Sequence, residues 1–280
     1  MDILAARTFL AVVETGSFVG AGRLIHASQS TISARIKALE DLLGKQVFVR
    51  SKAGCEMTAA GAQFLRYAQT LVRVWEEARH QVAVPPTFDE SILIGGQYSL
   101  WHGLLISWLR EFRRRSPRVA VRGEIGTPQR LMRELGEGAL DLAVMYRPEH
   151  RHGLVVRELF EDRLVLVSAA PETPLAENYI FFDWGEAFLT SHADALPDLH
   201  NPGLTLDLGA IGVDVLLDQK GAGYFPERIA APYLESKQLA RIDDAPSFSY
   251  PAYLVYRDGF ASKETMALAI ALLDEIAGAR

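Results

Sequence analysis

Residues 17–61 read SFVGAGRLIHASQSTISARIKALEDLLGKQVFVRSKAGCEMTAAG and hold two short helical patterns, a tight turn between them and a small β-ribbon pattern. Ser17 is a good N-cap for the first helix, and Ser28 is a good N-cap for the second. Gly44 follows the second helix where a left-handed residue commonly ends one. One apolar stripe of that helix is expected at Ile32, Ile36, Leu39 and Leu43. The stretch predicts a helix-turn-helix followed by a hairpin.

The face of the second helix opposite the stripe carries small hydroxyls, an amide and then positive charge. Small residues let a helix approach a major groove closely, and a glutamine can bond an adenine edge twice. The N-terminus of a helix also favours a phosphate. The candidate DNA-binding residues are Ser28, Gln29, Ser30, Thr31, Ser33, Arg35 and Lys37 in the helix, with Arg50 and Lys52 in the hairpin.

The same run resembles the N-terminal signature of LysR-type transcriptional regulators, in which Ser28–Ser33 opens the recognition helix and Thr58–Gly61 starts a long linker helix. The resemblance implies a winged helix-turn-helix. Three positions depart from the family pattern: Gly22 replaces an alanine, Ala53 replaces a second wing arginine, and Glu56 adds a negative charge. These departures concern the contacts between wing and phosphate.

The helix that starts at Thr58 is expected to reach about Val84, where Pro85-Pro86 stops it. Apolar residues recur in it at heptad spacing, which favours pairing with a second copy, although packing on its own domain is the alternative. The candidate dimerisation residues are Phe64, Ala68, Leu71, Trp75, Ala78 and Val82. Paired helices would hold two recognition helices about 34 Å apart, one per half-site. The resemblance implies the same dimerisation role and a tetramer, a dimer of dimers.

The distribution of charge indicates that only the N-terminal part of the chain contacts DNA. The chain of 280 residues has a net charge of −6, but residues 1–84 hold ten Lys and Arg against seven Asp and Glu. Gathered positive charge suits phosphate neutralisation. The remainder holds nineteen basic against twenty-eight acidic residues and is not expected to touch DNA.

Composition indicates a cytoplasmic protein. No run of eighteen apolar residues is present, so no membrane contact is expected, and the N-terminus is not a convincing signal peptide. The single cysteine, Cys55, excludes an intramolecular disulfide and is interpreted as a small apolar residue under the hairpin.

After residue 90 the pattern alternates strand, helix, strand, helix, strand as far as Tyr146, which predicts a parallel sheet with helices on its faces. This part resembles the effector-binding domain of the LysR-type family, which implies two α/β lobes like those of periplasmic binding proteins. Ser99-Leu100-Trp101 and Asp183-Trp184-Gly185 resemble the HdfR branch of the family. The fold class is therefore α/β with a winged-helix N-terminal domain.

The expected domains are a DNA-binding domain at about 1–58, a linker helix and hinge at about 59–86, and an effector-binding domain at about 87–280. Within the last, lobe I covers about 87–163 and 256–280, and lobe II about 164–255.

Ligands of such sheets bind outside the carboxyl ends of the strands. An anion could be held by Ser99 at a helix end and by Arg147 through two bonds, while tryptophan rings could cover an apolar part. The candidate effector-binding residues are Ser99, Leu100, Trp101, Thr127, Tyr146, Arg147 and Trp184. For each, a purely structural role is an equal alternative.

No Gly-x-Ser-x-Gly elbow, Walker loop or dinucleotide fingerprint is present, and the seven histidines are scattered. No enzyme activity, cofactor or metal is therefore expected. The expected function is a transcriptional regulator that binds double-stranded promoter DNA, itself and a small-molecule effector. The alternatives are a small-molecule binding protein whose N-terminal module serves association, and a cytoplasmic α/β enzyme.

Overall fold

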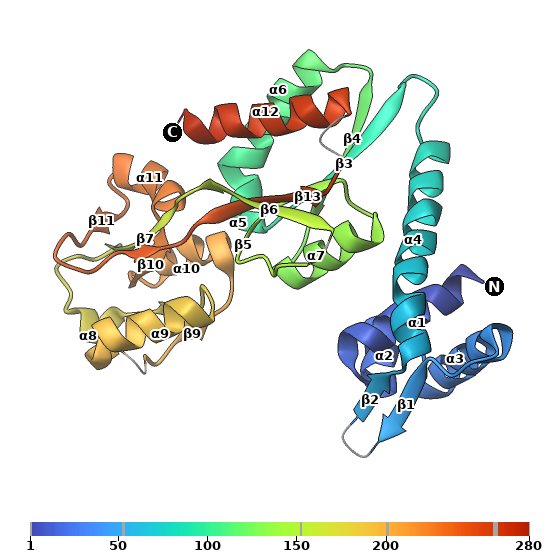
Figure 1. Cartoon of the computed structure of the whole chain (residues 1–280). Coiled ribbons are helices and arrows are strands. Elements are labelled where there is room, and N and C mark those ends of the chain that lie inside the picture. The colour runs from blue at the N-terminus through green and yellow to red at the C-terminus, as the bar shows by residue number, and fades with distance from the viewer. Residues whose placement is uncertain (1, 52–53, 152, 200–201, 260–262, 280) are drawn as a thin grey trace. The chain divides into compact units, whose positions relative to one another are not determined.

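A computed structural model describes residues 2–51, 54–151, 153–199, 202–259 and 263–279. The chain forms two compact units, residues 1–91 with 133–141, and residues 92–132 with 142–280 (Figure 1). No single helix in the described ranges is long and apolar enough to cross a membrane, although the bent pair Ile3–Thr15 and Phe18–Leu24 passes that test together by length and composition.

The first unit is a winged helix-turn-helix with a long helix attached. Its elements are α1 (Ile3–Thr15), α2 (Phe18–Leu24), α3 (Gln29–Leu43), β1 (Phe48–Ser51), β2 (Gly54–Met57) and α4 (Ala59–Val82). β1 and β2 pair antiparallel, from Phe48 with Met57 to Ser51 with Gly54. Phe9 of α1 contacts the rings of Phe48 and Phe64, at centroid distances of 5.1 and 5.0 Å, and so joins the wing and α4 to one core.

Capping fixes the ends of these helices. The hydroxyl of Ser17 accepts from the backbone N–H of Gly20, and that of Thr58 from the N–H of Gly61. Gly44 ends α3 with φ 65°, the left-handed conformation predicted for it.

Gly22, a departure from the family pattern, is explained by the turn between α2 and α3. A β-carbon at position 22 would lie 2.6 Å from the carbonyl oxygen of Ala27. Only a residue without a side chain lets the turn approach α2 this closely.

The apolar stripe of α3 is shorter than predicted. Ile32, Ile36 and Leu39 are buried, but Leu43 is 41% exposed and its neighbour Leu42 is 68% exposed. The prediction for Leu43 was wrong, because the helix extends past the core of the unit before Gly44 ends it.

The rest of the chain, from residue 90 onward, forms two lobes; most of it is the second unit, but residues 90–91 and 133–141 are assigned to the first. Lobe I contains β3 (Glu90–Gly96), α5 (Tyr98–Leu100), the π-helical segment η1 (Trp101–Leu105), α6 (Ile106–Arg115), β4 (Val119–Ile125), α7 (Pro128–Glu137), β5 (Leu142–Tyr146), β6 (Leu154–Phe160), β13 (Ala252–Arg257) and α12 (Glu264–Gly278). Its sheet has the order β4-β3-β5-β13-β6. α6 and α12 lie side by side against this sheet (Figure 1).

The sheet of lobe I is mixed rather than wholly parallel. β3 and β5 are parallel as predicted, whereas β13 runs antiparallel to both β5 and β6. The chain returns to lobe I with β13, which begins at Ala252, close to the expected position of about 256. The late strand thus lies between two early ones and covers the edge of β5.

Lobe II is built on β7 (Arg163–Ser168), which pairs antiparallel with β10 (Ala222–Pro226), β11 (Ala240–Arg241) and β12 (Phe248–Ser249). β8 (Phe181–Phe182) and β9 (Thr205–Leu206) are parallel and only two residues each. The helices of this lobe are α8 (Leu175–Asn178), α9 (Glu186–Ala195), η2 (Pro197–Leu199), η3 (Gly209–Ile211), α10 (Gly212–Asp218) and α11 (Glu227–Glu235).

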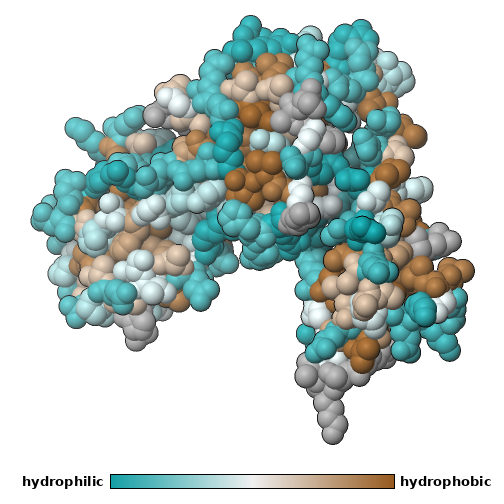
Figure 2. Space-filling view, in the orientation of Figure 1, coloured by the Kyte–Doolittle hydropathy of each residue, from teal (hydrophilic) through white to brown (hydrophobic). Residues whose placement is uncertain are grey.

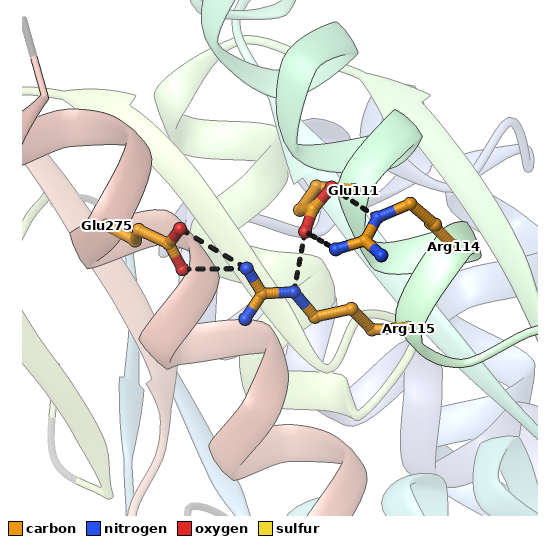
Figure 3. Close-up of polar contacts among 4 residues, drawn as sticks. All are labelled: Glu111, Arg114, Arg115 and Glu275. Carbon is orange, nitrogen blue, oxygen red and sulfur yellow. Dashed lines mark hydrogen bonds and ion pairs between the residues drawn. The ribbon is translucent and has the colours of Figure 1, made fainter.

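A polar network joins α6 to α12 on the surface of lobe I (Figure 3). The carboxylate of Glu111 accepts from Nη2 of Arg114 and from Nε of Arg115, each at 2.6 Å. Nη2 of Arg115 also donates to the carboxylate of Glu275 at 3.1 Å. Hydrogen bonds from Arg114 and then Arg115 lower the pKa of Glu111 to about 2.

Candidate nucleic-acid interface and effector pocket

The N-terminal end of α3 presents polar side chains on a rigid support. The hydroxyl of Ser28 accepts from the backbone N–H of Thr31 at 3.1 Å and lies 2.8 Å from the hydroxyls of Ser30 and Thr31. Gln29 and Ser30 are exposed, and the side chain of Gln29 makes no hydrogen bond with the described residues. The end of the helix is therefore fixed by its cap, while its amide remains available to a ligand.

A groove runs beside α3, between it and the start of β1. It has a volume of about 860 Å³ and is lined by Ser33 and Lys37, two of the candidate DNA-binding residues. Glu40 sits in the same groove and accepts from the backbone N–H of Val47 at 2.9 Å. Glu40 thereby positions the strand of the wing relative to α3, a role that sequence reasoning did not assign to it.

The remaining DNA-binding candidates differ in placement. Arg35 is half-buried and points to α1, where Nη1 lies 3.5 Å from the hydroxyl of the buried Thr8. Arg50 lies in β1, but its side chain is outside the described part of the structure. Lys52 falls outside the described residues altogether.

The six candidate dimerisation residues divide between two neighbouring faces of α4. Phe64 and Ala68 are buried in the core of their own unit, at 8% and 0% exposure. They are unavailable to a second copy, because they already pack with α1 and the wing. Leu71, Trp75, Ala78 and Val82 are exposed.

Two further apolar side chains that sequence reasoning missed, Tyr67 and Val74, extend this exposed face; they are 55% and 56% exposed. Helical spacing places them beside Leu71 and Ala78. Figure 2 shows hydrophobic patches along the surface that α4 forms. We call Tyr67, Leu71, Val74, Trp75, Ala78 and Val82 the α4 stripe.

In the second unit, Arg147 and Trp184 line one pocket of about 480 Å³. Trp184 is buried, donates from Nε1 to the carbonyl of Tyr224 at 2.7 Å, and meets the ring of Tyr250 edge-on at 5.7 Å. We call this space the Trp184 pocket. It is lined by Arg147, Pro148, His150, Val156, Trp184, Ala187, Phe188, Ser191, Ser247, Phe248, Ser249, Tyr250, Pro251 and Tyr253.

Arg147 is held in place without a carboxylate partner. Its φ of 53° is left-handed, a conformation that costs about 1–3 kcal/mol for a residue other than glycine. Its guanidinium lies against Gly185, where a β-carbon would collide with it. It forms no hydrogen bond or ion pair with the described side chains, so its charge is available at the pocket.

Ser99 and Tyr146 do not line this pocket. Both contact Arg228, a residue of α11 that sequence reasoning missed: Nη2 of Arg228 donates to the carbonyl of Ser99 at 3.1 Å and to the hydroxyl of Tyr146 at 2.9 Å. Arg228 lies two residues after the end of β10, and a search near the carboxyl ends of strands could have found it.

Three further candidates do not line the Trp184 pocket. Leu100 is fully buried in the core of the unit. Trp101 packs on Gly96 and Gly123 and donates from Nε1 to the carbonyl of Glu124 at 2.9 Å. Thr127 is exposed and its hydroxyl lies 3.4 Å from the N–H of Arg130 in the first turn of α7.

Two stacked tyrosines connect Arg228 with the Trp184 pocket. The rings of Tyr146 and Tyr250 stack at a centroid distance of 4.0 Å, and Tyr250 also lines the Trp184 pocket. Burial raises the pKa of both hydroxyls. Both therefore stay protonated and can donate a hydrogen bond.

Two family models match the chain. The model described as "LysR substrate binding domain" matches residues 89–277, and the model described as "Bacterial regulatory helix-turn-helix protein, lysR family" matches residues 3–62. Most of α4 lies between the two matched ranges.

Among individual proteins, the chain is 29% identical over 260 residues to the HTH-type transcriptional regulator HdfR of Salmonella newport (strain SL254), covering 91% of this chain and 92% of that protein. Solved structures show the same fold. ArgP from Mycobacterium tuberculosis has a TM-score of 0.59 at 23% identity, covering 98% of this chain and 96% of that one. Full-length CbnR complexed with its target DNA has a TM-score of 0.52 at 18% identity, covering 99% and 100%.

Proposed function

Because the chain belongs to the LysR family of bacterial regulatory helix-turn-helix proteins, we propose that the N-terminal end of α3 reads bases in a DNA major groove. The chain is a DNA-binding transcriptional regulator with a C-terminal effector-binding domain. The observation that carries the assignment of residues is the exposed Gln29 beside the capped hydroxyls of Ser28, Ser30 and Thr31. Gln29 bonds a base edge, and the helix N-terminus meets a phosphate.

Phosphate contacts come from the positive side chains around this end. Lys37 and Ser33 face the groove beside α3, Arg50 is in β1, and the sequence predicts Lys52 as a further phosphate contact. Arg35 holds α3 to α1 through Thr8 and contributes positive field rather than a base contact.

Self-association uses the α4 stripe. Its side chains are apolar and exposed in the single chain, and pairing two copies would bury them. Two paired chains read two half-sites, and two such dimers form a homotetramer on a promoter. For the domain limits we propose those expected from the sequence, with the return to lobe I at Ala252, where β13 begins.

The effector binds in the Trp184 pocket. Five of its fourteen lining residues are Trp, Phe or Tyr, and the guanidinium of Arg147, which pairs with no described side chain, lines it as well. The ligand class that fits is therefore a small anion with a flat apolar body, such as an aromatic carboxylate. Binding alters promoter contact to the extent that the ligand prefers one arrangement of the lobes over another.

The chain works in the cytoplasm and is not an enzyme. A regulator must reach the chromosome, and its family consists of transcription factors. The described residues hold no group of three or more His, Cys, Asp and Glu side chains that could bind a metal ion.

The test of DNA binding is a gel-shift titration with the region upstream of the protein's own gene, against an unrelated duplex of equal length, at several salt concentrations. A preference for the upstream region that survives rising salt is expected, because base contacts are less salt-dependent than phosphate contacts. Equal affinity for both duplexes at every salt concentration would refute the assignment to α3.

A further inference from the structure

Arg228 joins the two lobes through three hydrogen bonds and one ion pair. It lies in the first turn of α11 in lobe II, and its side chain is 12% exposed. Nη1 donates to the carbonyl of His102 at 3.0 Å, and Nη2 to the carbonyl of Ser99 at 3.1 Å and the hydroxyl of Tyr146 at 2.9 Å. Nε lies 3.5 Å from Oδ2 of Asp162. None of these partners belongs to α11.

The acceptors form a set that selects a cation. The hydroxyl of Tyr146 donates to Oδ2 of Asp162 at 3.1 Å, so its oxygen is free to accept from Arg228. Asp162 is 5% exposed and accepts at Oδ1 from the N–H of Arg163 at 2.9 Å. The ring of Phe160 lies 5.7 Å from the guanidinium. Two carbonyls, a hydroxyl and a carboxylate, closed on one side by an aromatic ring, fit a guanidinium or an ammonium group.

A break in the helix after β3 provides the two carbonyls. Within η1, His102 has φ −66° and ψ 110°, and Gly103 has φ 88° and ψ −58°, so the chain leaves helical geometry there. The carbonyls of Ser99 and His102 accept from Arg228 instead of serving only the helix. This part of the domain therefore presents carbonyl oxygens, which bind a cation. A helix N-terminus would present N–H groups, which bind an anion.

We propose that Ser99, His102, Tyr146 and Asp162 form a guanidinium-binding site in the effector domain, filled here by Arg228 of the opposite lobe. A ligand with a guanidinium or alkylammonium group enters this site only by displacing Arg228, and doing so releases the contact between the lobes. The proposal rests on the proposed function of this domain as the effector domain.

Two observations indicate that Arg228 can be displaced. Its Nε is buried and has no hydrogen-bond acceptor within the described ranges, so the fit of the side chain is incomplete. Burial also raises the pKa of Asp162, while the charge of Arg228 opposes that shift. The carboxylate thus depends on a cation in the site, whichever molecule supplies it.

The test is rescue of Arg228→Ala by the free guanidinium ion in the full-length protein. Spin labels at Arg110→Cys in lobe I and Asp214→Cys in lobe II, both exposed and in a Cys55→Ser background, report the distance between the lobes. Wild type should give one narrow distribution. Arg228→Ala should give a broader one, which guanidinium chloride at tens of millimolar restores, while sodium chloride or urea at the same concentration does not. The variant should bind guanidinium about tenfold or more tightly than wild type.

Arg241→Ala is the matched control. Arg241 also belongs to lobe II and pairs with Glu227 of α11 and with Asp243, and within the described residues it has no hydrogen bond or ion pair with lobe I. It should keep the narrow distribution and show no response to guanidinium. If Arg228→Ala does not fold, Tyr146→Phe removes one acceptor and should broaden the distribution alone.

Two results would overturn the proposal: an Arg228→Ala distribution equal to that of wild type with no added guanidinium binding, or a Tyr146→Phe distribution that is unchanged. These readouts are made without DNA. If the gel shift shows no sequence preference but guanidinium rescues Arg228→Ala, only the DNA-binding assignment is contradicted. If the gel shift shows sequence preference but guanidinium does not rescue Arg228→Ala, only the guanidinium site is contradicted.

Discussion

The guanidinium of Arg147 lies in the space that a side chain at position 185 would need. Gly185 has φ 101° and ψ 175°, a conformation that is essentially restricted to glycine. The two residues belong to different lobes, and Arg147 lines the Trp184 pocket beside Trp184, the residue before Gly185. Position 185 therefore determines both the backbone after β8 and the placement of the pocket's cation.

Gly185→Ala should lower the free energy of unfolding by about 2 kcal/mol, because the new β-carbon strains the backbone and displaces Arg147. Urea denaturation of the full chain measures the change. Gly203→Ala, in the same lobe but with nothing within 4 Å of its β-carbon position, should be close to neutral. Equal midpoints for the two variants would contradict this account of Gly185.

Arg147→Ala should weaken binding of an aromatic carboxylate such as benzoate by about tenfold, since a hydrogen bond to a charged group is worth about 1.5–3 kcal/mol. Isothermal titration or thermal shift measures it. Arg151→Ala removes a nearby arginine that already pairs with Glu149 and should leave binding unchanged. An equal loss in both variants would mean that only the general positive field matters.

Gln29→Ala should relax base preference, whereas Arg50→Ala should weaken all duplexes alike and reduce the slope of log affinity against log salt by about 1. Gel-shift titrations with single-base variants of the bound site, at four salt concentrations, measure both quantities. Loss of specificity to the same degree in both variants would count against the reading role of α3.

Leu71→Asp and Trp75→Asp should each convert the protein to a smaller oligomer without unfolding it, because both side chains are exposed and apolar in the single chain. Light scattering after size exclusion reports the mass, and circular dichroism reports the fold. Gln69→Asp, an exposed position outside the α4 stripe, is the control. Ala68→Asp should instead unfold the first unit, since Ala68 is fully buried. A full-sized oligomer in Trp75→Asp would exclude the stripe as the interface.

Glu111→Gln should be less stable than wild type only at pH values at which the Glu111 carboxylate of wild type is charged. The pKa of Glu111 falls from an ordinary 4.5 to about 2 in the folded chain, owing to Arg114 first and Arg115 second. A carboxylate with a lowered pKa stabilises the folded chain above pH 4.5, and this stabilisation is lost as the pH falls toward 2. The difference in urea midpoint between variant and wild type should therefore narrow below pH 4.5. Exposed Glu172→Gln is the control, and a gap that does not vary with pH would refute the electrostatic cause.

The helix-turn-helix could be predicted because its signals are local. Ser28, Gly44 and the buried Ile32, Ile36 and Leu39 are close in sequence, and each acts within one helix. Leu43 shows the limit of that reasoning, since periodicity does not say where the core ends.

The effector domain could be predicted only in outline. Arg228 meets Tyr146 and Ser99 across 82 and 129 positions of sequence, and no local pattern encodes such a contact. For Trp101 the sequence leaves a ligand contact and a structural role open, and the glycines at 96 and 123 leave room for its ring on the sheet. A side chain at the end of a strand can point to either face of the sheet. The face depends on contacts with residues that are distant in the sequence, and no local pattern predicts those contacts.

The stacked rings of Tyr146 and Tyr250 have one more consequence. One ring borders the site filled by Arg228, and the other borders the Trp184 pocket. Occupancy of either site that tilts its ring must shift the other ring, and thermodynamic reciprocity then requires each occupant to change the affinity of the other by the same factor. A regulator built in this way can respond to the combination of an acidic and a basic metabolite rather than to either signal alone.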